Sequence, residues 1–335
     1  MSLVQKLTTT EKGINFTNIA LMLLSTGVAF VIPFKLFLFV YAVLGPLHYL
    51  TEISWLDKRN FFIKQKTQIW PYIVIAFLLT VALFDEKSTL RYYTVSLILC
   101  VVTYTLCLVF SGKNSLSLMV SVLVFVLAIV IKADRIMFLI LAFGIFLPTI
   151  VHVFLFTGLF ILQGALKNKS LTGFISLAVF IVCALSFIFI KIPNPEILSL
   201  TEKGYIQKYF SIMNQSLAAV FNIPFVRNSN EIFETPTFIA IQRFIAFAYT
   251  YHYLNWFSKT SVIKWHDVSK TRLSIIAMLW VISVACYYID YRLGFMVLFL
   301  LSMLHVFLEL PLNVLSVKGI SMGVKSMFTT TTVAK

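Results

Sequence analysis

The sequence predicts an all-α, polytopic integral membrane protein, a bundle of about ten transmembrane helices, from its composition, its hydropathy and its long apolar runs. Hydrophobic residues make up 60% of the 335 residues and charged residues 12%, and the mean hydropathy is +0.93. Soluble domains are roughly 45–50% apolar and about 25% charged. A chain this apolar is expected to cross a membrane several times.

The apolar runs define the expected helices, because about 17–25 apolar residues cross a hydrocarbon core of about 30 Å. They lie at about 15–33, 35–56, 69–84, 91–110, 115–132, 136–164, 172–190, 237–258, 272–289 and 294–317. The first two are joined by a short turn around Pro33 and Lys35. The sixth is long enough to be tilted, kinked at Pro148 or partly outside the membrane.

Residues 1–335 are expected to form one transmembrane domain with one substantial extracytoplasmic segment, at about 192–236. Apolar residues at roughly helical spacing in this segment favour an amphipathic helix on the outer interface, with an ordinary connector as the alternative. Arg243 follows it, near the outer end of the eighth span, and is expected to reach outward or to pair with a carboxylate.

The formal net charge of +14 is unequally distributed between the two sides of the membrane. If the spans alternate from a cytoplasmic N-terminus, most Lys and Arg residues fall in the tails and the cytoplasmic loops, as Lys and Arg resist translocation. We therefore expect both termini in the cytoplasm and the protein in the plasma (inner) membrane. Clusters such as the one around Lys58 and Arg59 then contact lipid headgroups, so the basic charge indicates no nucleic-acid partner.

Several function classes lack their sequence signals. The chain has no Gly-rich phosphate loop and no G-x-S-x-G motif, which gives an ATP-driven or serine-hydrolase function no support. The four cysteines lie in apolar stretches without C-x-x-C spacing, so we expect buried thiols and no c-type haem attachment.

Four of the five histidines lie in predicted spans, and those spans are all even-numbered. Even-numbered spans run in one direction, which places the four imidazoles at a common depth, about 9–18 Å from the cytoplasmic ends at 1.5 Å per residue. Ionisable groups are costly within the hydrocarbon and tend to face one another or a cavity. The predicted ligands of a shared metal centre are therefore His48, His152, His252 and His305.

Two carboxylates belong to the same layer. Glu52 and Glu309 each follow a histidine by four residues, which places them on the same helix face about one turn away. Imidazole and carboxylate bind non-haem iron, either as two histidines with one carboxylate or as histidines that carboxylates orient. Both roles are open for the two glutamates. Tyr49 and Tyr253 flank the histidines and are candidates to hydrogen-bond a ligand or dioxygen.

Ferrous iron is the expected metal, with zinc and haem as alternatives. The stretch Gly45-Pro46-Leu47-His48-Tyr49-Leu50-Thr51-Glu52 resembles the Gly-Leu-Pro-His-Gly-x-x-Asp signature of the Brp/Blh-type membrane β-carotene dioxygenases. Tyr49 and Glu52 stand where that signature has Gly and Asp, and the later H-x-x-x-H pair of that family is absent. The resemblance implies that His48 binds ferrous iron and that dioxygen cleaves the central double bond of β-carotene to give retinal.

The leading hypothesis is a membrane-embedded non-haem iron oxygenase. Its partners would be O2 and a carotenoid or another lipophilic substrate that enters from the bilayer. A proton- or ion-coupled transporter is the first alternative, since buried His and Glu side chains also relay protons. A b-type haem protein and a non-enzymatic membrane protein are the others.

Overall fold

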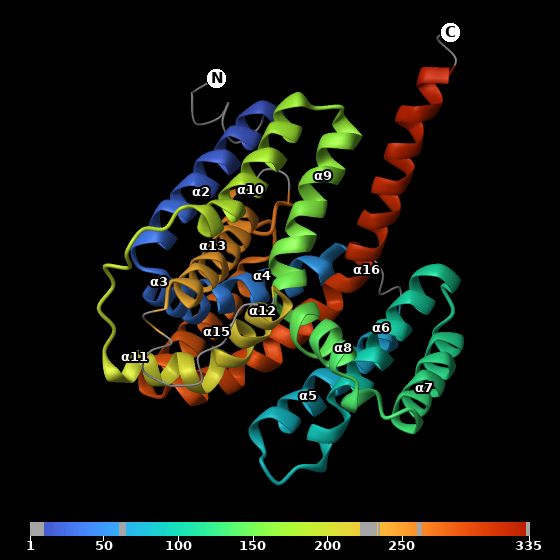
Figure 1. Ribbon diagram of the computed structural model, residues 1–335. Helices are drawn as coiled ribbons and strands as arrows, with labels where there is room; N and C mark the ends of the chain where they lie inside the picture. Colours follow the sequence, from blue (N-terminus) through green and yellow to red (C-terminus); the bar gives the residue numbers. More distant parts are fainter. Residues whose placement is uncertain (1–9, 60–64, 222–232, 234, 260–262, 333–335) are drawn as a thin grey trace. The chain divides into compact units, whose positions relative to one another are not determined.

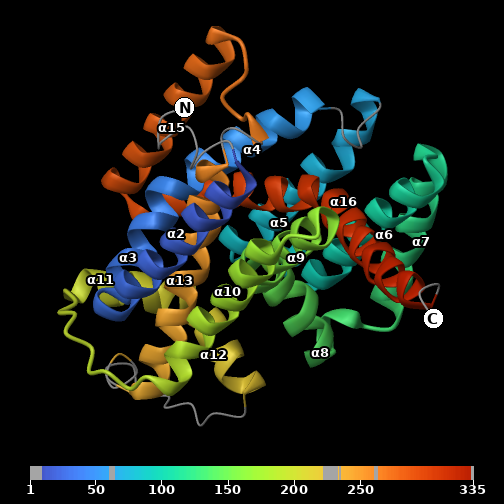
Figure 2. The same ribbon diagram turned by 90° about the horizontal axis from the view of Figure 1, so that it is seen from above.

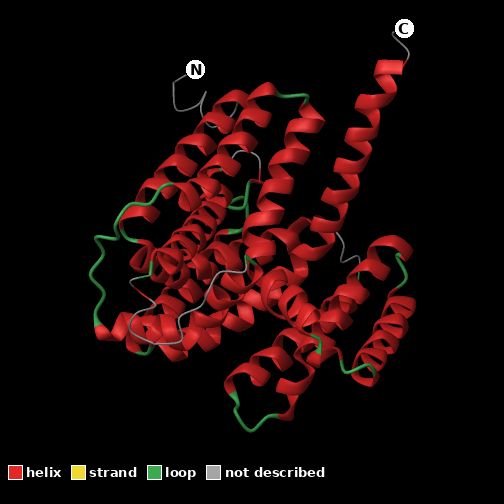
Figure 3. Ribbon diagram, viewed as in Figure 1, coloured by secondary structure: helices red, strands yellow, loops and turns green. Residues whose placement is uncertain are grey.

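The computed structural model describes residues 10–59, 65–221, 233, 235–259 and 263–332 (Figure 1). These residues form helices joined by loops and turns, and no strand occurs among them (Figure 3). The all-α prediction is confirmed for this part of the chain.

The predicted apolar runs lie on helices, and among the described residues eight helices are long and apolar enough to cross a membrane. They are Glu11–Val31, Pro33–Lys58, Lys66–Phe84, Thr89–Ser111, Met137–Asn168, Leu171–Phe189, Lys270–Ile289 and Tyr291–Lys325. The two other runs form a shorter apolar helix, α7 (Asn114–Val130), and a more polar one, α13 (Pro236–Ser258). A count of about ten spans and the side on which the termini lie stay predictions.

The chain forms two compact units, each made of segments that contact one another more than they contact the rest of the chain. Unit 1 comprises Met1–Leu44, Val153–Lys264 and Met322–Lys335, and unit 2 comprises Gly45–His152 and Trp265–Ser321. The expectation of a single transmembrane domain stays a prediction.

Unit 1 is built around α13, which contacts α2 (Glu11–Val31), α3 (Pro33–Phe39), α10 (Leu171–Phe189) and α12 (Ser211–Val220). α2 and α13 lie side by side in both views (Figures 1 and 2). Most side chains of α13 are buried. The remaining elements are the π-helical turn η1 (Val40–Leu44), α9 (Thr157–Asn168), α11 (Leu200–Tyr205) and the π-helical turn η6 (Ile206–Phe210).

Arg243 of α13 is buried among backbone carbonyl groups of unit 1. Its guanidinium donates hydrogen bonds to the carbonyl oxygens of Ile192 at 2.9 Å, Phe30 at 3.0 Å and Pro193 at 3.2 Å. Phe30 lies in the last turn of α2, where carbonyl groups have no helical partner. Arg243 therefore pairs with one carbonyl group at the end of α2 and two in the segment after α10, where the sequence had suggested a carboxylate or the outer surface.

α2 and α3 are separate helices because Pro33 has no N–H group and restricts the residue before it, Ile32. The Glu196 carboxylate caps the new helix by accepting hydrogen bonds from the backbone N–H groups of Phe34 at 2.9 Å and Lys35 at 2.7 Å. Partial burial raises the pKa of the Glu196 carboxyl, and these two N–H groups oppose the shift.

We expect the replacement Glu196→Ala to destabilise unit 1 by about 1 kcal/mol, because it leaves the first N–H groups of α3 without their acceptor. The measurement is the thermal midpoint of the purified protein in detergent. Glu196→Gln is the matched control, since its amide oxygen still accepts one of the two bonds and should lose less. An unchanged midpoint for Glu196→Ala would show that the cap contributes nothing.

Unit 2 has an apolar core between α4 (Gly45–Arg59), α5 (Trp70–Phe84), α6 (Thr94–Ser111) and α16 (Tyr291–Thr332). α16 and the π-helix η5 (Ile140–Phe156) continue beyond this unit. The other elements are η2 (Lys66–Ile69), η3 (Thr89–Tyr93), α7, η4 (Ala133–Arg135), α8 (Met137–Leu139) and α15 (Lys270–Ile289).

Gly294, in the first turn of α16, allows this helix to approach the end of α15 closely. A Cβ atom at this position would lie 2.7 Å from the Cα atom of Tyr287 and closer still to its ring. Because the obstacle includes backbone, the two helices would have to move apart to accept it. We expect Gly294→Ala to lower the stability of unit 2 by about 1–2 kcal/mol, as overpacking commonly does.

The thermal midpoint of the purified protein tests this expectation. Gly27→Ala in α2 is the control, because a Cβ atom there meets nothing within 4 Å. A midpoint for Gly294→Ala equal to that of Gly27→Ala would contradict the packing argument.

Candidate metal centre

The first histidine of the centre lies on α4 together with its carboxylate. His48 and Glu52 are one helical turn apart, and 1% and 2% of their surfaces are exposed. His48 Nε2 lies 3.1 Å from Glu52 Oε2. The i, i+4 spacing that the sequence shows is therefore a direct contact in the folded chain.

The second histidine lies on η5, a π-helix of 17 residues that contains Pro148. Proline cannot donate a backbone hydrogen bond, and π-helical turns are rare features that often occur at functional sites. The sequence suggested a tilt, a kink at Pro148 or a part outside the membrane for the sixth span, and in the structure this region is π-helical. His152 follows Pro148 by four residues and is 2% exposed.

The third histidine is His305 on α16, and its imidazole ring contacts the imidazole ring of His152. The two Nε2 atoms are 3.0 Å apart. Glu309, one turn after His305, places Oε2 3.1 Å from His152 Nδ1. His152 thus contacts a carboxylate with one ring nitrogen and an imidazole with the other.

Together these three histidines form a compact group within unit 2. Among the described residues, His48, His152 and His305 are the set whose ligand atoms all lie within 4.8 Å of one another. The ring centroid of His305 lies 5.4 Å from that of His48 and 4.9 Å from that of His152, both edge to face. Three of the four predicted ligands are therefore brought together.

The nitrogen separation fits a shared metal ion. Two ligands bound at right angles, each about 2.1 Å from a metal, are about 3.0 Å apart, and at tetrahedral angles about 3.4 Å apart. The Nε2 atoms of His152 and His305 are 3.0 Å apart, a hydrogen-bond distance that is also compatible with two nitrogens bound to one metal ion. All three imidazoles are buried, as expected for groups that need a partner in an apolar interior.

The contacts of the two carboxylates favour an orienting role over direct ligation. Neither Glu52 nor Glu309 belongs to the compact group. Glu309 Oε2 lies 3.1 Å from Nδ1 of His152, and Nε2, on the other side of the ring, is directed at His305. Metal-binding histidines commonly have this carboxylate partner, which selects the tautomer and orients the ring.

Tyr49 lies against the centre in a way that the sequence did not indicate. Its ring stacks on the His305 ring, with centroids 4.0 Å apart and an angle of 24° between the planes. Tyr49 is itself 2% exposed. The ring therefore covers one face of His305 and restrains its orientation, and the hydrogen bond from Tyr49 to a ligand stays a prediction.

His252 is the predicted ligand that lies outside the compact group; it belongs to unit 1. Its Nδ1 atom is 2.9 Å from the Thr157 hydroxyl, which itself donates to the carbonyl oxygen of Val153. The hydroxyl therefore accepts from Nδ1–H of His252. Tyr253 is buried beside it, at 5.6 Å between ring centroids. The proposed roles of His252 and Tyr253 stay predictions.

Asn313 is a polar residue near the centre that the sequence reasoning missed. It follows Glu309 by four residues on α16 and is 1% exposed. The signal was present in the sequence, because His305, Glu309 and Asn313 repeat at intervals of four residues. That interval continues the face of the helix that carries the centre.

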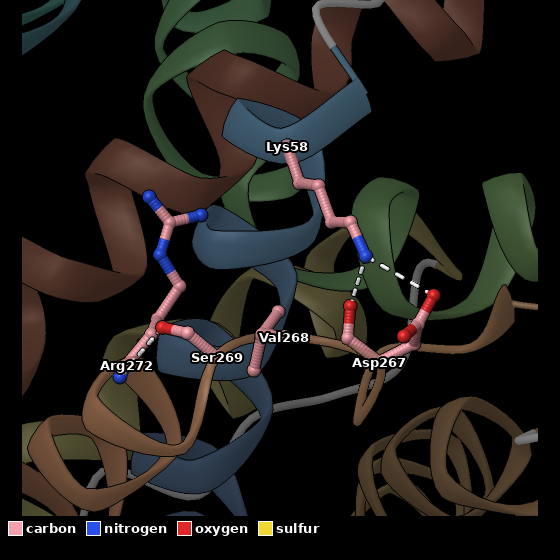
Figure 4. Close-up of a pocket in the computed structure, with 5 residues that line it drawn as sticks. All are labelled: Lys58, Asp267, Val268, Ser269 and Arg272. Carbon is pink, nitrogen blue, oxygen red and sulfur yellow. Dashed lines mark hydrogen bonds and ion pairs between the residues drawn. The ribbon is translucent and has the colours of Figure 1, made fainter.

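A charged cleft of about 460 Å³ also occurs in unit 2, lined by Lys58, Asp267, Val268, Ser269 and Arg272 (Figure 4). Lys58 pairs with Asp267 at 3.1 Å, and Arg272 pairs with Asp57 at 2.6 Å. All four charged side chains are substantially exposed. This cleft suits polar groups and does not resemble an entry for an apolar substrate.

Comparisons with family models, curated proteins and solved structures found no match for this chain. Its function must therefore be argued from the buried histidine group and its surroundings.

Proposed function

We propose that this protein is an integral membrane non-haem iron oxygenase that acts on a carotenoid or another lipophilic substrate. The convergence of His48, His152 and His305 inside an apolar helical unit carries the proposal. Bound ferrous iron would supply dioxygen activation, with coordination positions left open by the three imidazoles.

The three imidazoles would hold the metal, and Glu309 would keep the proton of His152 on Nδ1. Glu52 would do the same for Nε2 of His48, which would leave Nδ1 of that ring to bind the metal. Tyr49 would restrain His305 by stacking. These contacts prepare the ligand atoms before the metal binds, so little rearrangement is needed.

The types of side chain in the group support iron as the proposed metal. Three convergent imidazoles with two carboxylates beside them are ligand types of non-haem iron, and zinc accepts the same ligands. Metal analysis of the purified protein distinguishes these two ions, and an absorption spectrum distinguishes either of them from haem.

The apolar surroundings and the Brp/Blh-like stretch around His48 support a lipophilic substrate. A carotenoid or a similar polyene would reach the centre from the bilayer, where dioxygen also dissolves well. Cleavage of β-carotene to retinal is the specific reaction that this likeness suggests. A plasma (inner) membrane location accords with the eight long apolar helices.

The first test is the metal content of protein purified without chelators. We expect about one iron per chain, as one three-histidine group predicts. Expression in cells that accumulate β-carotene should then yield retinal, measured by chromatography of the extracted pigments. Protein that contains no metal and takes up none would contradict the metal centre. Iron-loaded protein that leaves every carotenoid offered intact would retain the centre and contradict the substrate class.

A further inference from the structure

α16 carries a line of buried polar side chains that extends past the histidine centre. The polar stripe of α16 consists of Ser302, His305, Glu309, Asn313 and Ser316, all at most 7% exposed. Steps of three or four residues keep these side chains on one side of a helix. Met303, Val306, Phe307 and Leu310, about a quarter turn away, pack into the apolar core instead.

Asn313 is the informative member of the stripe. Within the described part of the chain, neither its amide oxygen nor its amide nitrogen has a hydrogen-bond partner. Burying such an amide without a partner is unfavourable, because the hydrogen bonds that it makes to water in the unfolded chain are lost. Buried polar groups are nearly always satisfied by protein or by ordered water. The position therefore calls for a small polar ligand that both donates and accepts hydrogen bonds, which describes water.

Pro311, two residues before Asn313, leaves a backbone carbonyl group able to bind water. Pro311 lies within α16 and has no N–H to donate to the Phe307 carbonyl oxygen one turn earlier. In membrane helices, carbonyl groups released by proline are commonly satisfied by neighbouring polar side chains or by ordered water. The unpartnered Asn313 amide and the carbonyl released by Pro311 therefore lie within about two turns of each other.

The stripe ends close to a polar boundary. Ser316 is 2% exposed, whereas Val317 is 50% exposed and Lys318 is exposed as well. A lysine at the end of an apolar helix normally marks the aqueous interface. From Glu309 to Lys318 the helix rises only about 14 Å, at 1.5 Å per residue.

We propose that the polar stripe between Glu309 and Lys318 binds a short chain of water molecules that connects the histidine centre with the aqueous side of the membrane. The path itself goes beyond the proposed function, because it requires water and no metal.

The test is the reactivity of single cysteines in metal-free protein, in a background where the four native cysteines are replaced by alanine. The probe is (2-aminoethyl)methanethiosulfonate, a small charged reagent that travels through water. Asn313→Cys is the deciding position and Leu310→Cys is the matched control, since Leu310 is 5% exposed on the same helix but packs in the apolar core. We expect Asn313→Cys to react at least ten times faster. Equal rates would overturn the proposal.

A second measurement does not depend on the cysteine variants. In a dry interior, Asn313→Leu would remove an unsatisfied amide and raise the thermal midpoint or leave it unchanged. At a hydrated position, the leucine would remove the hydrogen bonds between the amide and bound water and leave the neighbouring polar groups without that water, so we expect the midpoint to fall. A midpoint at or above that of the wild type overturns the proposal. Both experiments use metal-free protein, so their outcome is independent of whether the wild type binds iron.

Discussion

Replacing His305 by alanine is expected to reduce the iron content of the purified protein to about a tenth or less of the wild-type value. His305 is the central member of the group, with its Nε2 atom 3.0 Å from that of His152 and its ring 5.4 Å from that of His48. Two remaining imidazoles hold a metal ion much more weakly than three, because each lost ligand removes a bond that water replaces poorly.

The iron content is measured by mass spectrometry of protein purified from iron-supplemented cells. His266→Ala is the matched control, because His266 is exposed and outside the compact group. The elution volume on size exclusion shows whether each variant keeps its fold. His305→Ala protein that is folded and still binds a full equivalent of iron would contradict the centre.

The variant His252→Ala separates a three-histidine from a four-histidine centre. Iron retention at the wild-type level would limit the role of His252 to its hydrogen bond with Thr157. A loss comparable to that of His305→Ala would make His252 the fourth ligand.

Replacing Glu309 by glutamine is expected to weaken metal affinity by about 10–100-fold, the range typical of carboxylates that orient a metal-binding histidine. The glutamine has nearly the same size, but it lacks the negative charge that attracts a proton on His152 Nδ1, 3.1 Å away. It can also present its amide N–H to the ring, which favours the tautomer with the proton on Nε2. That tautomer has no lone pair directed at the metal.

Affinity is measured by titrating metal-free protein with Co²⁺ in competition with a chelator. Glu86→Gln, at an exposed turn, serves as the control. The thermal midpoint of the metal-free variant must also be compared with that of the metal-free wild type. An unchanged affinity, whatever the midpoint, would show that Glu309 does not prepare His152 for the metal.

The extent of the helices could be predicted closely from the sequence. The run at 91–110 lies within Thr89–Ser111, and the run at 172–190 corresponds to Leu171–Phe189. A long apolar segment must satisfy its backbone internally, and the helix is the structure that does so within one segment. Length and hydropathy therefore determine both the element and its approximate ends.

Most contacts of the individual rings could not be predicted from the sequence and became visible only in the folded chain. His48 and Glu52 could be paired from their spacing, since a regular helix brings residues four apart together. The direction in which the His152 ring points could not be predicted from the spacing, because η5 is π-helical and its side chains do not follow the 3.6-residue period. The stacking of Tyr49 on His305 depends on how two helices pack, which no periodicity encodes.

By itself, the sequence determined that four histidines and two glutamates lie within long apolar segments, where each charge or polar group needs a partner. Only the tertiary structure decided which partners those are. It groups His48, His152 and His305, directs Glu309 at the far nitrogen of His152, and gives His252 the Thr157 hydroxyl. The physical reason is that the cost of burial depends on composition and depth, whereas its compensation depends on the rotation and packing of each helix.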